Sequence, residues 1–72
     1  GVMYAHITRW KFAPGVADDT MRRFTDQCLP QLRQASGFHS YEAIKTAADH
    51  ALAISRWESE AGAVAAGALT RE

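Results

Sequence analysis

The stretch Ile54-Ser55-Arg56-Trp57-Glu58-Ser59-Glu60 decides the fold, because it joins the end of a strand to the start of a helix. Before Glu58, one set of alternate residues is Leu52, Ile54 and Arg56, and the other is Ala53, Ser55 and Trp57. This period of two is typical of a β-strand. Ser59 then offers a hydroxyl to the unpaired N–H groups of a helical first turn, and Glu60 complements the helix dipole. The sequence therefore predicts a strand that ends directly before a helix.

Two elements are predicted in the first half of the chain. Residues Val2–Phe12 are rich in aromatic and β-branched side chains and predict a long strand, which ends at the turn Ala13-Pro14-Gly15. Residues Val16–Ser36 predict an amphipathic helix, with a kink or a weak last turn at Pro30 and a left-handed Gly37 directly after it. The apolar stripe of this helix consists of Ala17, Met21, Phe24, Cys28, Leu32 and Ala35.

Two further strands and a helix are predicted in the second half. Phe38–Thr46 and Ala51–Glu58 form an antiparallel hairpin across the short connection Ala47–His50, and a second helix runs over Ser59–Leu69. Gly62 and Gly67 each cost that helix about 1 kcal/mol relative to alanine, so we expect it to be the softest element. The order β-α-β-β-α predicts a single α+β domain over residues 1–72, with a ferredoxin-like antiparallel sheet that lacks its final strand.

The composition argues against several classes of partner. Eight Lys and Arg residues balance eight Asp and Glu residues without a basic block, so binding to nucleic acid or to an anionic membrane is not expected. No apolar run approaches the ~20 residues of a membrane span, and no secretory signal pattern is present. Cys28 is the single cysteine, and we interpret it as an inert core thiol. That interpretation fits a cytoplasmic protein.

The first strand predicts self-association. Tyr4, His6, Thr8, Trp10 and Phe12 share one face, whereas Met3, Ala5, Ile7, Arg9 and Lys11 share the other. Both faces begin with apolar residues, and one layer of helices covers only one of them. We therefore expect a homodimer in which a second chain covers Met3, Ala5 and Ile7, while Arg9 and Lys11 reach water or a polar seam.

Three stretches carry a family resemblance: Phe12-Ala13-Pro14-Gly15, Ser36-Gly37-Phe38-His39-Ser40-Tyr41-Glu42, and Ile54 to Glu60. Together they resemble the antibiotic biosynthesis monooxygenase-like family of dimeric α+β barrels, over nearly the whole chain. Members of that family usually close the sheet with a fourth strand and pair two sheets face to face. We expect the closing strand to be absent or truncated here, because the sequence ends at Glu72.

The resemblance also implies where a ligand would bind. It places Tyr4, His6, Thr8 and Trp10 on the strand face that looks toward the helices, where family enzymes hold substrate. Similar monooxygenases use neither metal nor flavin, because the anion of a phenolic substrate itself reduces dioxygen. His6 is the candidate base or anion-stabilising donor, Tyr4 is a candidate to orient a hydroxyl, and Trp10 is a candidate to stack on an aromatic ring. The same alternation is also expected for a purely structural strand with cross-strand polar pairs.

Four other residues are candidates for contact with substrate, each with a structural alternative. His39 and Tyr41 are expected to share one strand face, where they line either the pocket or the dimer seam. Arg56 either clamps an anionic group or makes an ion pair at the sheet edge. Trp57 either touches ligand or acts as a packing anchor. His50 lies in the predicted turn and is expected to be solvated.

Other chemistries find little support in the sequence. The histidines and Cys28 lack metal-ligand spacing, no glycine-rich phosphate loop exists, and no nucleophile elbow surrounds a serine. One subgroup of the resembled family degrades haem with an asparagine, a tryptophan and a histidine. The first two positions fall at Thr8 and about Ala66, and the third lies past Glu72, so this activity is disfavoured.

Three functions therefore compete. The first is a cofactor-independent monooxygenase acting on a small aromatic or polyketide-like metabolite, as the resemblance implies. The second is a non-catalytic dimeric module that binds a small hydrophobic ligand or stabilises an assembly. The third is an enolate-handling isomerase or decarboxylase, which would use the same base and pocket.

Overall fold

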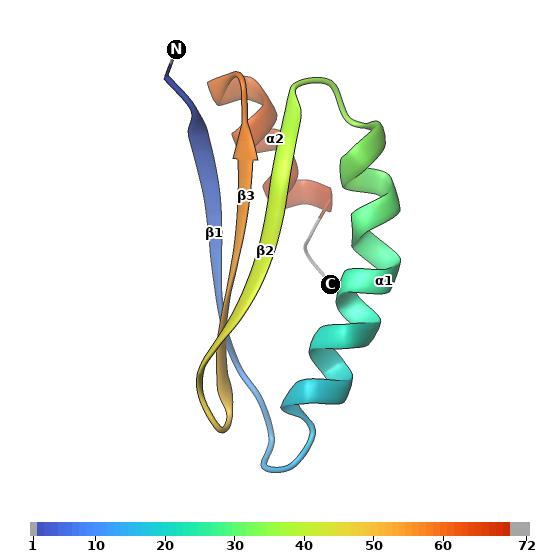
Figure 1. Cartoon of the computed structure of the whole chain (residues 1–72), viewed down its shortest axis with the longest axis vertical. Helices are drawn as coiled ribbons and strands as arrows, with labels where there is room; N and C mark the ends of the chain where they lie inside the picture. Colours follow the sequence, from blue (N-terminus) through green and yellow to red (C-terminus); the bar gives the residue numbers. More distant parts are fainter. Residues whose placement is uncertain (1, 70–72) are drawn as a thin grey trace.

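The chain forms two helices and three strands in the predicted order β-α-β-β-α (Figure 1). The computed structural model describes residues 2–69. The elements are β1 (Tyr4–Lys11), α1 (Ala17–Gln34), β2 (Phe38–Ala47), β3 (His50–Trp57) and α2 (Glu60–Leu69). None of the helices described is both long and apolar enough to cross a membrane.

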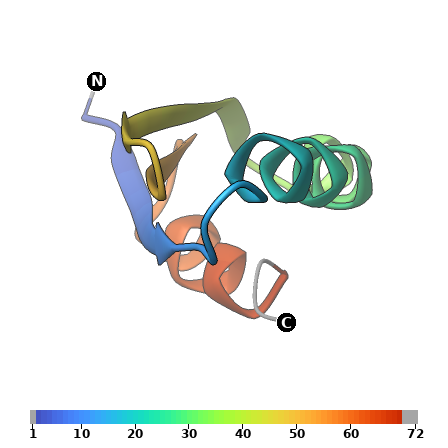
Figure 2. The ribbon, with the colours of Figure 1, turned by 90° about the horizontal axis from the view of Figure 1, so that it is seen from below.

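The strands form one antiparallel sheet in the order β1-β3-β2, so the hairpin strand β3 is central. Figure 2 shows both helices on the same side of this sheet. Helix α1 packs mainly on β2, and α2 packs on β1 and β3. The fold is therefore ferredoxin-like, and within residues 2–69 the sheet is open and has no fourth strand.

The ends of the elements differ slightly from those predicted. The hairpin turn is Ala48-Asp49 rather than four residues, because pairing extends to Ala47 and His50. Helix α1 runs past Pro30 to Gln34 and is followed by an extended Ala35. Gly37 is left-handed, with φ of +81°, but it lies further from the helix than predicted. It turns the chain into β2, and its carbonyl accepts the Glu58 N–H at 2.8 Å.

The predicted start of α2 is confirmed by its cap. The Ser59 hydroxyl accepts the Gly62 N–H at 3.1 Å, so one unpaired donor of the first turn is satisfied. Glu60 occupies the first turn, where its charge favours the helix dipole. The stretch that ends β3 therefore also fixes where α2 begins.

The core lies at this strand–helix junction. Leu32, Trp57, Ala63 and Ala66 form its buried cluster. The Trp57 side chain is 1% exposed, and its indole Nε1–H donates to the Ser55 hydroxyl at 2.8 Å. The Phe38 ring packs edge-on against Trp57, with 5.4 Å between ring centroids. Trp57 is therefore a packing anchor with its polar group satisfied.

The apolar stripe of α1 is only partly core. Ala17, Cys28 and Leu32 are buried, as the stripe predicts. Phe24 is only partly buried, because it borders an open cleft, where its ring packs edge-on against Trp10 at 4.6 Å between centroids. The apolar stripe predicts that Phe24 packs in the core beside Cys28 and Leu32, and this prediction is wrong, since Phe24 forms a wall of the cleft described below.

Within residues 2–69, no element covers the other face of the sheet. Ile7 is 50% exposed and Ile44 is 41% exposed. In the strand register Ile7 lies opposite Ile54, and Leu52 lies opposite both Arg9 and Ile44. We call this uncovered surface, formed by Ala5, Ile7, Ile44, Leu52 and Ile54, the outer sheet face.

A pair of truncations separates the core from the cleft. Leu32→Ala removes a fully buried side chain and should cost about 2–5 kcal/mol, enough to unfold much of so small a domain. Phe24→Ala should cost distinctly less, because one side of its ring already faces solvent. Urea unfolding followed by circular dichroism measures both free energies. Equal destabilisation by the two variants would place Phe24 back in the core.

Candidate functional site

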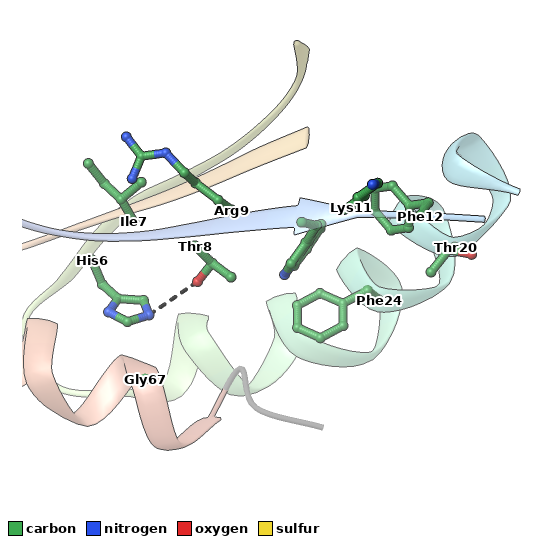
Figure 3. Close-up of a pocket in the computed structure, with 10 residues that line it drawn as sticks. His6, Ile7, Thr8, Arg9, Lys11, Phe12, Thr20, Phe24 and Gly67 are labelled. Atoms are coloured by element: carbon green, nitrogen blue, oxygen red, sulfur yellow. Dashed lines mark hydrogen bonds between the residues drawn. The ribbon is translucent and has the colours of Figure 1, made fainter. Parts of the chain in front are cut away.

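An open cleft of about 640 Å³ lies between β1, the first half of α1 and the end of α2. Figure 3 shows the side chains of His6 and Thr8 on the side of β1 that faces Gly67, and those of Ile7 and Arg9 on the opposite side. The lining residues are His6, Ile7, Thr8, Arg9, Trp10, Lys11, Phe12, Thr20, Phe24 and Gly67. The cleft is thus built mainly from one strand.

One end of the cleft is aromatic. The Trp10 ring lies edge-on to both Phe24 and Phe12, with 4.6 Å and 5.9 Å between centroids. Edge-on packing leaves ring faces available to a flat ligand. Thr20 is the polar side chain that α1 adds to this end. The arrangement suits a planar aromatic molecule with a polar substituent.

The other end holds His6. Its Nε2 lies 3.2 Å from the Thr8 hydroxyl oxygen, and both side chains are partly buried. If Nε2 carries the proton, it donates to Thr8 and leaves the Nδ1 lone pair as the proton acceptor. If Nδ1 carries the proton, Thr8 donates to Nε2 and occupies its lone pair. Because Thr8 engages Nε2 in either tautomer, Nδ1 is the ring nitrogen that is left to act as a base, in the tautomer that carries its proton on Nε2.

Gly67 allows α2 to approach the His6 ring. A Cβ atom at position 67 would lie 3.2 Å from His6 Cε1, 3.7 Å from Nε2 and 3.8 Å from Nδ1. Any larger side chain would therefore press on the imidazole. Since the His6–Thr8 bond is already long at 3.2 Å, a small displacement of the ring would break it.

Tyr41 lies below the cleft floor. It borders a small hollow together with His6, Trp10 and Ser55, among others. Its hydroxyl is buried and makes no hydrogen bond of ordinary geometry to the described residues. Burial raises the pKa of this hydroxyl, Thr25 lowers it, and Cys28 raises it further, with a net rise. Tyr41 thus remains a neutral phenol at the bottom of the site.

Cys28 is buried on α1, and burial raises the pKa of its thiol. A raised pKa keeps the sulfur protonated near neutral pH, and a protonated thiol is a poor nucleophile. Within residues 2–69, no group of three or more His, Cys, Asp or Glu side chains is arranged to hold a metal ion.

The structure brings together four of the eight predicted site residues. His6, Thr8 and Trp10 line the cleft, and Tyr41 borders the hollow beneath it. Tyr4 shares their side of β1 but lies beyond the cleft and is 40% exposed.

The remaining three predicted residues lie elsewhere. Trp57 is buried in the core and has no surface to offer a ligand in the cleft. Arg56 follows Ile54 on the outer sheet face side of β3 and pairs with Glu42 at 3.7 Å. Its strand is central, so the expected pair does not lie at the sheet edge.

The expectation that His39 and Tyr41 share a strand face is wrong. A shift of register, which inserts one extra residue, separates Phe38 from Ser40 in the pairing of β2 with β3. As a result Phe38 and Tyr41 both pack toward the core, whereas His39 is exposed. No turn residue in the sequence marks this bulge.

Sequence reasoning did not predict seven of the ten residues that line the cleft, which are Ile7, Arg9, Lys11, Phe12, Thr20, Phe24 and Gly67. Phe12 lies on the same strand face as His6 and Trp10, so its position was readable from the alternation. The position of Phe24 in the helical stripe indicated a core residue. The one signal at Gly67 was its low helix propensity. Which residues of two helices meet one strand depends on helix placement, which no local pattern encodes.

The chain belongs to the antibiotic biosynthesis monooxygenase family, since the model of that family matches residues 3–66. The match covers all three strands, α1 and most of α2. Comparisons with curated proteins and with solved structures gave no match. Membership agrees with the ferredoxin-like fold and does not by itself fix a substrate.

The two glycines of α2 should respond in opposite ways to alanine. Gly62→Ala would place a Cβ 2.9 Å from the immobile Trp57 ring, so stability should fall. Gly67→Ala meets the partly exposed His6 ring, which can move into the cleft, so the helix should gain about 0.5–1 kcal/mol.

Two measurements check this pair. Urea unfolding gives the signs of the stability changes, and NMR of the imidazole rings should show His6 shifting in Gly67→Ala while the exposed His39 and His50 stay unchanged. A Gly67→Ala variant with unaltered His6 resonances would contradict the close contact.

Proposed function

We propose that this protein is a cofactor-independent monooxygenase that acts on a small aromatic or polyketide-like metabolite. One observation carries the proposal: the single histidine of the cleft, His6, lies on the strand that also presents the aromatic Trp10. Family membership supports the reaction class.

The reaction needs a base and electron-rich carbon. A ring nitrogen of His6 takes the acidic proton of a phenol or of an activated CH₂ group, and the resulting anion transfers electrons to dioxygen. A C–O bond then forms, the O–O bond breaks, and the CH₂ group becomes C=O. One oxygen atom enters the product, and the other leaves as water with two protons from the substrate carbon. Atoms and electrons balance without a further reductant.

Each cleft residue has a distinct role in this scheme. Thr8 orients the His6 ring through the 3.2 Å contact to Nε2 and leaves Nδ1 open to the substrate. Trp10 and Phe24 hold the substrate ring by stacking, and His6 accepts its proton. The four residues act on binding, orientation and proton transfer.

A binding module without catalysis is the second candidate. Its support is the openness of the cleft, which borders solvent along β1, whereas oxygen chemistry on an anion favours a dry site. An isomerase or decarboxylase would use the same base, and no contact in the cleft favours it over oxidation.

We also propose that the protein is a homodimer joined through the outer sheet face. Ile7, Ile44 and their neighbours form an exposed apolar strip on a domain with a small core of its own. A chain of this size buries only about 60% of the surface that its unfolded form exposes, so covering this face would stabilise it. A cytoplasmic location stays a prediction.

Turnover measurements test His6. His6→Ala should keep its fold and lose about 10² to 10⁴ in turnover, the usual contribution of general base catalysis. Oxygen consumption is followed against a panel of hydroxylated anthrones and quinols, with chelator present. His39→Ala is the matched control, because His39 is exposed and outside the cleft. Trp10→Phe should change substrate affinity more than turnover.

The outcomes separate the candidates. Parent-level turnover in a folded His6→Ala variant would remove His6 from the mechanism. Binding of these aromatic compounds without any oxygen consumption by the parent would favour the binding module instead.

Two variants, each with one introduced charge on a different side of the molecule, test the dimer. Ile7→Glu places a carboxylate in the outer sheet face and should convert the dimer to a monomer. Val64→Glu is the control, because Val64 is 72% exposed on α2, away from that face. Sedimentation at micromolar concentration distinguishes the species, and a monomeric parent would contradict the proposal.

A further inference from the structure

A small hollow lies in the floor of the cleft, where the sheet presents its shortest side chains to the helices. Ala53 of β3 stands opposite Thr8 of β1 and Ala43 of β2, so this row of the sheet fills little space. The neighbouring row has Ser55 at its centre, and this side chain is also short. Both Ala53 and Ser55 line the hollow. The hollow therefore follows from the pairing of the three strands with one another.

Aromatic rings enclose this hollow. Trp10 borders it from β1, Tyr41 from β2 and Phe24 from α1. Its volume is about 10 Å³, against about 640 Å³ for the cleft. A space of this size holds one molecule about as large as water and excludes an aromatic ring. Because His6 and Trp10 line both spaces, an occupant of the hollow lies beside the candidate base and the aromatic wall of the cleft.

The polar groups around the hollow are already engaged. The Thr8 hydroxyl oxygen and His6 Nε2 lie 3.2 Å apart, and the Ser55 hydroxyl accepts the Trp57 indole N–H at 2.8 Å. The Tyr41 hydroxyl lies near two side chains of α1, and neither of them borders the hollow. These contacts leave few partners for a water molecule, which typically makes about three hydrogen bonds when it is buried. The hollow therefore suits a small apolar molecule better than it suits water.

We propose that this hollow is a binding site for dioxygen, the second substrate of the proposed oxygenase reaction. Dioxygen is apolar and only slightly larger than water, so it matches a space formed by rings and the Ala53 methyl group. Bound there, it lies beneath the substrate ring that Trp10 stacks, and it is in place when His6 generates the anion. The inference rests on the proposed function, because that reaction is what gives the bound oxygen a use.

NMR under oxygen pressure locates dioxygen in the full chain, because dioxygen is paramagnetic and speeds the relaxation of nearby methyl protons. The Ala53 methyl should relax faster under oxygen than under the same pressure of nitrogen. The Ala51 methyl is the matched control, since Ala51 lies on the same face of β3, is 2% exposed against 5% for Ala53, and does not border the hollow. Equal effects at the two methyls, or a long-lived water beside Ala53, would overturn the proposal.

Filling the hollow tests its role in turnover. Ala53→Val adds two methyl groups there and should raise the KM for oxygen by about tenfold, a modest part of what a two-atom ligand can gain from a site. The KM for the aromatic substrate should stay unaltered, because Ala53 does not line the cleft. Ala43→Val makes the same change opposite Ala53 and outside the hollow, so it should alter neither constant.

The outcomes separate this site from the proposed function. In Ala53→Val, a raised KM for the aromatic substrate with an unchanged KM for oxygen would assign the hollow to a substrate substituent and overturn the proposal. The relaxation measurement on the parent decides the matter even where Ala53→Val does not fold. Faster relaxation at Ala53 in a parent that consumes no oxygen would support the site and contradict the oxygenase function. Oxygen consumption with equal relaxation of both methyls would support the function and overturn the site.

Discussion

Burial of the Trp57 indole is the constraint on which the remaining structure depends. The ring is 1% exposed at the last position of β3, and its only polar group is satisfied two residues away by Ser55. Moving a side chain of this size to solvent would remove the largest apolar contribution in a 72-residue chain. The strand must therefore end with its face turned to the helices, and Ser59 must start α2 directly above it.

The position of α2 then follows from glycine. Gly62 lies so close to the Trp57 ring that a Cβ atom at this position would clash with it. Gly67 lies close to His6 at the other end of the same helix. Both residues lower helix propensity, which alone would count against them. The structure shows why the lower helix propensity is tolerated, because each glycine leaves space for a ring. One glycine admits the core anchor, and the other admits the imidazole, so the helix that closes the core also forms a wall of the cleft.

The order of elements and the cap at Ser59 were predictable, because each depends on local periodicity or on hydrogen bonds within one turn. The site was predictable only in part. Strand alternation placed His6, Thr8 and Trp10 on one face, and the family resemblance implied that this face looks toward the helices. His39 failed because a bulge shifts that alternation without a marker in the sequence. Phe24 failed because a helical stripe does not reveal which of its residues border a gap.

The small side chains of the central strand explain why a cleft forms at all. On the helix side β3 presents Ala51, Ala53 and Ser55 before Trp57, and each of the three is buried. Short side chains leave a space above them, which Trp10 and Tyr41 of the edge strands and Phe24 of α1 fill only partly.

A hollow of this kind reduces the apolar area that a small domain can bury against itself. Branched side chains such as Ile7, Ile44 and Ile54 stand instead on the outer sheet face, where the chain alone leaves them partly in water. The distribution of side-chain size across the two faces therefore ties the cleft to assembly. Apolar side chains that do not fill the inner face lie on the outer sheet face instead. A second protein surface packed on that face would shield them from solvent.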